Sequence, residues 1–219
     1  MSRIVIDGNI GSGKTTQLGL LEKKGWTVRR EPIDDWPLEK FYKDPKKWAF
    51  YFHMVILKTL RPLKTKKPVV YERSLLSSRW VFWPILVRQY DLPKEEDELY
   101  SKFYDDYYWF PDLYIFLSKS PEKAWDHVQK RGQAGDFGVT LDYIRELDVE
   151  YKKLIRSVPC KVIVVNADRT PEEIHDEICR HLSENELLIS DVDGRQVPKT
   201  SGSGREVQCS FIPNMCCVS

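Results

Sequence analysis

A glycine-rich segment near the amino terminus has the residue types that bind phosphate groups. Residues 8–15 are Gly-Asn-Ile-Gly-Ser-Gly-Lys-Thr, which fit the pattern G-x-x-x-x-G-K-[ST] without departure. In such a P-loop the glycines let backbone N–H groups surround the phosphates, the lysine reaches the β- and γ-phosphates, and the hydroxyl ligates Mg²⁺. We therefore predict that Thr15 is a ligand of Mg²⁺ and that ATP is bound by Gly8, Asn9, Ile10, Gly11, Ser12, Gly13, Lys14, Thr15 and Thr16.

Two further groups of charged residues follow short apolar runs. Glu31 comes directly after residues 26–30, and Glu72 and Arg73 come directly after residues 68–71. If both runs are parallel strands, their carboxyl ends meet at one edge of a sheet, where α/β proteins bind ligands. A carboxylate there can accept a proton, and a guanidinium offers forked donors to phosphate oxygens. The alternatives are that Glu31 is a surface residue and that Glu72 and Arg73 form an ion pair with each other.

The elements that must position these residues alternate between strands and helices. Short β-branched runs at residues 3–7, 26–30, 68–71, 112–117 and 161–165 predict five strands. Helical patterns occupy residues 15–24, 46–63, 75–88, 95–109, 121–131, 141–158 and 171–182, and Pro84 is expected to bend or break the third of them. Apolar strands separated by helices indicate an α/β protein, with a five-stranded parallel sheet and helices on both faces.

The chain has the length of one sizeable domain. Residues 1–186 carry the alternating pattern, and residues 187–219, rich in Gly, Ser, Pro and charge, are expected to form a flexible tail. The net charge of +1 gives no global attraction to nucleic acid. Five cysteines without metal-ligand spacing or a leader sequence favour the cytoplasm.

The carboxyl-terminal residues permit a different localisation. Cys216 stands fourth from the end with Ser219 last, which satisfies the C-a-a-X pattern of farnesylation, and Cys209 is a candidate second acylation site. The sequence therefore predicts membrane association only if Cys216 is prenylated, and the alternative is an unmodified cysteine-rich end.

Several blocks of sequence resemble the deoxynucleoside kinase family, including its insect multisubstrate, viral and mitochondrial thymidine kinase members. The resemblance covers residues 3–180 and rests on the P-loop together with Glu-Pro-Ile-Asp-Asp-Trp at 31–36, Tyr-Lys-Asp-Pro-Lys-Lys-Trp at 42–48, Glu-Arg-Ser at 72–74 and Asp-Leu-Tyr-Ile-Phe-Leu at 112–117. It implies a P-loop kinase fold, a homodimer, and transfer of the γ-phosphate of ATP to the 5′-hydroxyl of a deoxynucleoside for nucleotide salvage.

The resemblance also implies roles for single residues. Glu31 would take the proton of the 5′-hydroxyl, Glu72 would hold Mg²⁺ through water, and Lys14, Arg73 and Arg131 would neutralise developing charge. Tyr42 and Glu146 would hold the sugar 3′-hydroxyl. Trp36, Phe52 and Phe82 would sandwich the base, although aromatic residues at helical spacing are more often plain core.

Three positions that would face the base depart from the pattern of most relatives. His53 stands where most carry Gln, and an imidazole cannot make the same pair of side-by-side hydrogen bonds. Ile56 and Ser78 stand where cytidine- and purine-preferring members carry Arg and Asp, which favours thymidine or pyrimidines. His53 could equally be a packed helix residue.

The segment that would cover ATP also departs from the family pattern. Residues 131–139 match the family's lid but contain one arginine, Arg131, where relatives have several. Two rival functions stay open at this point. One is a nucleoside monophosphate kinase of the thymidylate type, which would need further arginines for the acceptor's phosphate. The other is a lipid-tethered P-loop switch protein, which would need a guanine-reading N-K-x-D motif that this sequence does not contain.

Overall fold

The computed structural model describes residues 2–132, 136 and 138–185, and its centre is a parallel sheet. The strands are β1 (Arg3–Gly8), β2 (Thr27–Arg29), β3 (Val69–Glu72), β4 (Leu113–Ser118) and β5 (Lys161–Asn166). They are ordered β2-β3-β1-β4-β5, and every neighbouring pair is parallel. The predicted five-stranded parallel sheet is therefore confirmed.

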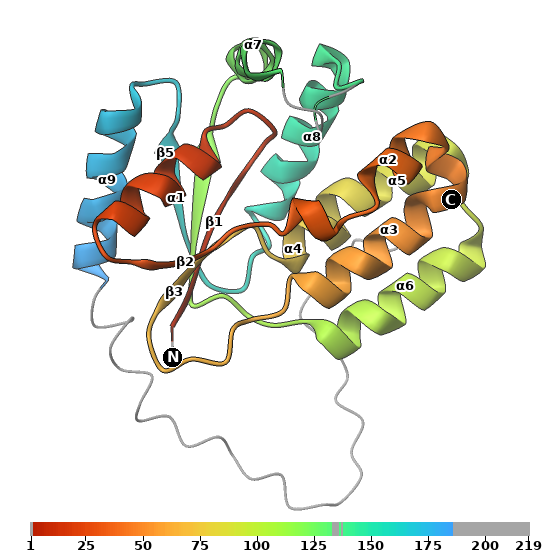
Figure 1. Cartoon of the computed structure of the whole chain (residues 1–219), viewed down its shortest axis with the longest axis horizontal. Helices are drawn as coiled ribbons and strands as arrows, with labels where there is room; N and C mark the ends of the chain where they lie inside the picture. The colour runs from red at the N-terminus through yellow and green to blue at the C-terminus, as the bar shows by residue number, and fades with distance from the viewer. Residues whose placement is uncertain (1, 133–135, 137, 186–219) are drawn as a thin grey trace, which may run out of the picture.

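Helices cover both faces of this sheet (Figure 1). Ile4 and Ile6 of β1 share one core cluster with α1 and α9, whereas Val5 belongs to a second cluster with α3, α4, α5, α6 and α8. Because successive side chains of a strand point to opposite faces, this alternation is what two covered faces require. The helices are α1 (Lys14–Lys23), α2 (Leu38–Lys43), α3 (Pro45–Thr59), α4 (Leu75–Ser77), α5 (Trp83–Tyr90), α6 (Lys94–Tyr107), α7 (Pro121–Arg131), α8 (Leu141–Leu154) and α9 (Pro171–Glu184).

Local chemistry sets several helix ends. The Asp44 side chain accepts a hydrogen bond from the backbone N–H of Lys47, and Pro45 occupies the first turn of α3. At α9, Thr170 and Glu173 form a reciprocal capping box. Both devices satisfy N–H groups that a helix start leaves without an intrahelical acceptor.

Residues 75–90 form three successive helical segments, which agrees with the expectation that Pro84 bends or breaks the helix of residues 75–88. The short helix α4 passes into a π-helical turn, η2 (Ser78–Phe82), and then into α5. Pro84 lies in the first turn of α5, where a missing N–H costs little. The helix α2 was not predicted, because six residues carry too short a pattern to be recognised.

Two expectations from the sequence fall outside the part that the structure describes. These are the tail of residues 187–219, with Cys209 and Cys216, and the part of the lid at residues 133–135 and 137. None of the helices in the described ranges is both long and apolar enough to cross a bilayer.

Candidate active site

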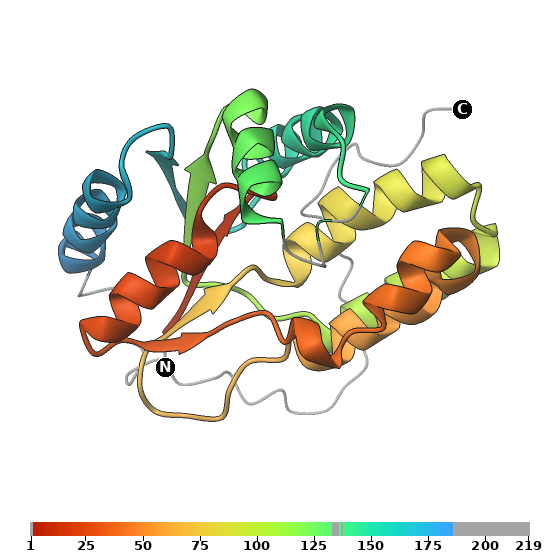
Figure 2. The ribbon, with the colours of Figure 1, turned by 45° about the horizontal axis from the view of Figure 1, so that its top comes forward.

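The P-loop follows β1 and leads into α1 at the carboxyl edge of the sheet (Figure 2). Gly11 and Gly13 have positive φ angles of 78° and 95°. A Cβ on Gly11 would lie 2.2 Å from the carbonyl oxygen of Ala124 in α7, so this position needs glycine for space as well as conformation. Asn9 donates to the carbonyl of Ile144 in α8 at 2.8 Å. The loop is thus anchored against the two helices that flank the lid segment.

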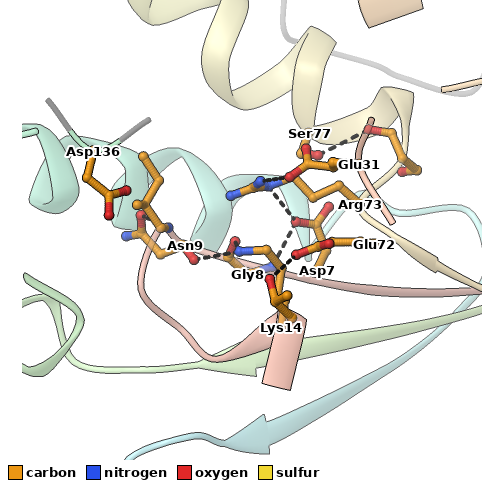
Figure 3. Close-up of polar contacts among 12 residues, drawn as sticks. Asp7, Gly8, Asn9, Lys14, Glu31, Glu72, Arg73, Ser77 and Asp136 are labelled. Atoms are coloured by element: carbon orange, nitrogen blue, oxygen red, sulfur yellow. Dashed lines mark hydrogen bonds and ion pairs between the residues drawn. The ribbon is translucent and has the colours of Figure 1, made fainter. Parts of the chain in front are cut away.

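Lys14 turns back over this loop. Its Nζ donates to the carbonyl oxygens of Gly8 at 3.0 Å and Asn9 at 2.9 Å, and Figure 3 shows the side chain among the charged residues of the site. Burial, and after it the positive charge of Arg73, lowers the pKa of Lys14 to about 7. A phosphate anion at the loop would favour the protonated ammonium, because opposite charges raise the pKa of a base.

Glu31 and Arg73 form a largely buried ion pair next to the P-loop. Arg73 Nη1 donates to Glu31 Oε2, and the two side chains are only 12% and 11% exposed. Arg73 lies directly after β3 with a φ of 60°, an uncommon conformation for a residue other than glycine. Glu31 follows β2, so the ends of two strands bring these side chains together, as predicted (Figure 3).

The electrostatic surroundings of Glu31 join it to the rest of the site. Burial raises the pKa of Glu31, the positive charges of Arg73 and Lys14 oppose that shift, and the negative charges of Glu72 and Asp7 reinforce it. Oε1 of Glu31 makes no hydrogen bond to any described residue, whereas Oε2 is taken by Arg73. A buried carboxylate of raised pKa, with one oxygen available, can accept a proton from a bound hydroxyl. The surface position considered for Glu31 is therefore wrong.

Glu72 contacts Thr15 of the P-loop rather than Arg73, its neighbour in the sequence. Its Oε1 accepts a hydrogen bond from the Thr15 hydroxyl at 2.8 Å. The alternative ion pair between Glu72 and Arg73 is wrong, since Arg73 pairs with Glu31 and Asp7. Thr15 and Glu72 instead present two oxygen atoms side by side at the P-loop, which are the ligand atoms that Mg²⁺ prefers.

Asp7 and Tyr151 support Arg73 and were not predicted from the sequence. Asp7 is fully buried, and its carboxylate accepts from the hydroxyls of Tyr114 at 2.7 Å and Tyr151 at 2.9 Å. Nε of Arg73 lies 3.7 Å from Asp7 and donates to the Tyr151 hydroxyl at 3.2 Å. The available signal was an acid inside an apolar strand, because a fully buried Asp almost always has partners.

The predicted aromatic residues lie in two contacting groups. Trp36 meets Phe52 edge-on with ring centroids 5.8 Å apart, and its Nε1 donates to Thr59 at 2.9 Å. Phe82, in η2, lies under the Arg73 guanidinium at 5.2 Å. Phe82 therefore contacts the charged residues through Arg73, whereas Trp36 packs against Phe52 and Thr59 of α3.

His53 and Ser78, both predicted at the base, contact each other. His53 is 1% exposed, and its Nδ1 lies 3.2 Å from the Ser78 hydroxyl, which lies 2.9 Å from the hydroxyl of Tyr100. The imidazole also packs against Trp83 and Tyr100. Burial lowers the pKa of His53 to about 3, so the ring is neutral. Ile56 is buried one turn further along α3.

The remaining predicted residues lie further toward the surface. Glu146 is exposed and accepts from Arg88 at 3.1 Å. Tyr42 and Glu146 both raise the pKa of Tyr143 beyond the effect of burial, so both lie near this tyrosine. Arg131 is exposed and donates to both carboxylate oxygens of Asp136, at 2.9 and 2.6 Å. In this arrangement the lid arginine is held by an acid of its own segment.

Known proteins are similar to this chain in both sequence and fold. Residues 4–188 match the family model described as deoxynucleoside kinase. A protein of Invertebrate iridescent virus 3 described as a kinase is 32% identical over 186 residues, which cover 82% of this chain and 95% of the viral protein. Human mitochondrial thymidine kinase 2 is 27% identical over 197 residues, covering 79% of this chain and 73% of that protein.

The structural comparison agrees with the family match. A solved structure of deoxyadenosine kinase from M. mycoides, with the product dCMP and a flexible dCDP bound, aligns with a TM-score of 0.76. The two sequences are 24% identical, and the alignment covers 83% of this chain and 98% of the other. At that identity the likeness establishes a common fold.

Proposed function

Because the chain belongs to the deoxynucleoside kinase family, we propose that it transfers the γ-phosphate of ATP to the 5′-hydroxyl of a deoxynucleoside. The observation that carries this proposal is the placement of Glu31. Its carboxylate is buried, has a raised pKa, and lies within the electrostatic reach of the P-loop lysine. This is the position from which a base can receive the proton of an acceptor hydroxyl as the bond to phosphorus forms.

Each charged residue has a distinct part in the proposed transfer. The free oxygen of Glu31 accepts the hydroxyl proton, while Arg73 holds the other oxygen and offers its remaining donors to the transferring phosphate. Lys14 neutralises charge on the β- and γ-phosphates. Arg131 would join them after leaving Asp136.

The oxygens of Thr15 and Glu72 fit a magnesium site. They lie 2.8 Å apart at the start of α1, and hydroxyl and carboxylate oxygens are suitable ligands for Mg²⁺. We propose that Thr15 binds the ion directly and Glu72 through water. When bound there, Mg²⁺ would neutralise negative charge on the phosphates of ATP.

For the acceptor we propose a thymidine or pyrimidine preference. Buried Ser78 and Ile56 are neutral, and the neutral His53 contacts Ser78. Neither charged group that would favour cytosine or a purine is present at these two positions. Tyr42 and Glu146 are proposed to hold the sugar 3′-hydroxyl.

A phosphorylation panel tests the proposal. Wild-type protein is assayed with ATP, Mg²⁺ and each of four deoxynucleosides, with thymidine monophosphate as a further acceptor. We expect phosphate on the nucleosides and little on the monophosphate. Glu31→Gln should lower kcat by about 10²- to 10⁴-fold while leaving ATP binding intact.

The matched control is Glu22→Gln, which changes an exposed carboxylate paired with Arg30 at 2.9 Å. This variant should keep wild-type turnover. Near-normal turnover in Glu31→Gln would remove Glu31 from the mechanism, and preferential use of the monophosphate would favour the rival kinase.

A further inference from the structure

A cleft lies at the amino-terminal edge of the sheet, away from the P-loop. It has a volume of about 1030 Å³ and forms where the loop of residues 61–66 meets the end of α6 and the start of β1. Arg3, which lines the cleft, is the first residue of β1, whereas Gly8, which begins the P-loop, is the last (Figure 1). The length of a central strand therefore separates the cleft from the candidate active site, and its volume is that of a site for a small organic molecule.

Cations predominate among the charged residues of this cleft. Its described lining contains one acid, Asp106, and four cations, which are Arg3, Arg61, Lys64 and Lys66. Arg3 already has an acidic partner. Lys64 and Lys66 are exposed, and their ammonium groups make no ion pair or hydrogen bond with a described residue. Because the whole chain has a net charge of only +1, this is a local concentration of positive charge, and it favours an anionic ligand.

Aromatic side chains form another part of the cleft wall. Tyr107, Tyr108 and Trp109 follow one another at the end of α6, and the Arg61 guanidinium lies 4.1 Å from the centroid of the Tyr107 ring. Trp109 is fixed by a hydrogen bond from its Nε1 to the carbonyl oxygen of Leu60 at 2.9 Å. Tyr107 and Tyr108 are half-buried, so part of each side chain is accessible to a ligand. Tyrosine rings and guanidinium planes both stack on flat aromatic ligands such as nucleobases.

We propose that this cleft is a second nucleotide-binding site, separate from the sites for ATP and for the acceptor. The phosphates of the nucleotide bind Lys64 and Lys66, and its base packs against the tyrosines at the end of α6. None of these residues has a part in the proposed phosphoryl transfer, and binding at the cleft does not require that transfer to occur. The inference therefore goes beyond the proposed function and can be tested apart from it.

The distribution of charge favours a single nucleotide over a strand of nucleic acid. A strand is bound along a basic stripe or groove that follows its backbone over several phosphates. Here the cations are gathered in one cleft, and the net charge of +1 provides no wider positive field. A free nucleotide presents its phosphates close together and carries one flat ring, which matches two free lysines beside two accessible tyrosines.

Calorimetric titration with ATP, in the absence of an acceptor, tests the proposal. We expect two sites per chain in the wild type. The double variant Lys64→Glu, Lys66→Glu should weaken the cleft site by about 10- to 100-fold and leave the P-loop site and kcat unchanged. Lys14→Met should weaken the P-loop site alone. The matched control is Lys94→Glu, Lys102→Glu, which makes the same change of charge at two exposed positions of α6 outside the cleft and should keep both sites.

Two further probes identify the ligand class, with Lys14→Met protein so that the cleft is measured alone. ATP should bind about 5- to 100-fold more tightly than inorganic triphosphate, because its base adds stacking, and added salt should weaken both. A single ATP site in the wild type, an equal loss in the control pair, or equal affinity for inorganic triphosphate would each overturn the inference. Tighter binding of an oligothymidylate through the same lysines would assign the cleft to nucleic acid instead. A missing P-loop site would count against the proposed function and leave the cleft result standing.

Discussion

The two sides of the candidate site are built in different ways. On the phosphate side, buried charges are concentrated at the strand ends: Asp7, Lys14, Glu31, Glu72 and Arg73 all interact. On the side where we propose that the nucleoside binds, called the nucleoside side, α3, η2 and α6 contribute aromatic rings and neutral polar groups, among them the His53–Ser78–Tyr100 chain.

This difference determines how costly a substitution is on each side. Removing one charge on the phosphate side leaves another charge buried without its partner, so substitutions there are costly. On the nucleoside side, a hydrogen bond can change direction or partner without leaving a buried charge. We infer that the phosphate side sets the chemistry and the nucleoside side can vary the substrate. The predictions below compare the two sides, beginning with the largest effect.

Arg73→Met should give the largest loss. It removes the guanidinium that pairs with the buried carboxylates of Glu31 and Asp7. We expect the free energy of unfolding to fall by about 3–5 kcal/mol, as for other buried charges that lose a partner. Urea unfolding at neutral pH measures it.

Arg145→Met is the control for this loss. Arg145 is also paired with two acids, Glu122 at 3.0 Å and Asp142 at 3.2 Å, but all three residues are exposed. Its effect on the free energy of unfolding should be small, because solvent screens an exposed ion pair. Equal losses of stability in the two variants would mean that the ion pairs of the phosphate side are not made stronger by their burial.

The phosphate side is also the part that sequence predicted best. The P-loop pattern and the apolar strands before Glu31 and Arg73 are local signals, and parallel strands place their ends at one edge. Asp7 and Tyr151 were missed because they are 144 residues apart and meet only in the folded chain. A pattern in one stretch of sequence carries no information about such a contact.

The nucleoside side was predicted less completely for a physical reason. The π-helical turn at residues 78–82 changes which side chains share a face, and π turns have no dependable local sequence signal. Pro84 was expected to bend or break the helix of residues 75–88, and it lies two residues after the π-helical turn, in the first turn of α5. The contact of His53 with Ser78 and Tyr100 depends on how three helical segments pack. The resemblance selected His53 and Ser78 as substrate contacts without indicating that they bond to each other.

His53 should make the stability of the folded protein fall at acidic pH. Burial lowers its folded-state pKa to about 3, against an ordinary value near 6.5. Between these values the unfolded chain binds more protons, so the free energy of unfolding falls as pH falls through 6.5. At pH 5 this group alone should cost about 2 kcal/mol relative to pH 7.5.

Denaturant unfolding at the two pH values measures this contribution by comparing wild type with His53→Gln, which should lack it. His127→Gln, which changes an exposed histidine of α7, is the control and should keep most of the wild-type pH dependence. If His53→Gln loses as much stability in acid as the wild type, His53 is not held neutral by burial.

Asp136→Asn should have the smallest effect. It tests whether Arg131 of the lid takes part in binding ATP on the phosphate side. Arg131 is held by Asp136 through two hydrogen bonds, and an amide would hold it less strongly. Arg131 is exposed, so the pair contributes little energy, and its release should lower the KM for ATP by about 2- to 5-fold. Steady-state kinetics with varied ATP measures this, with Asp142→Asn, next to Arg145, as the control. A higher KM for ATP in Asp136→Asn would mean that Asp136 places Arg131 for the phosphate rather than withholding it.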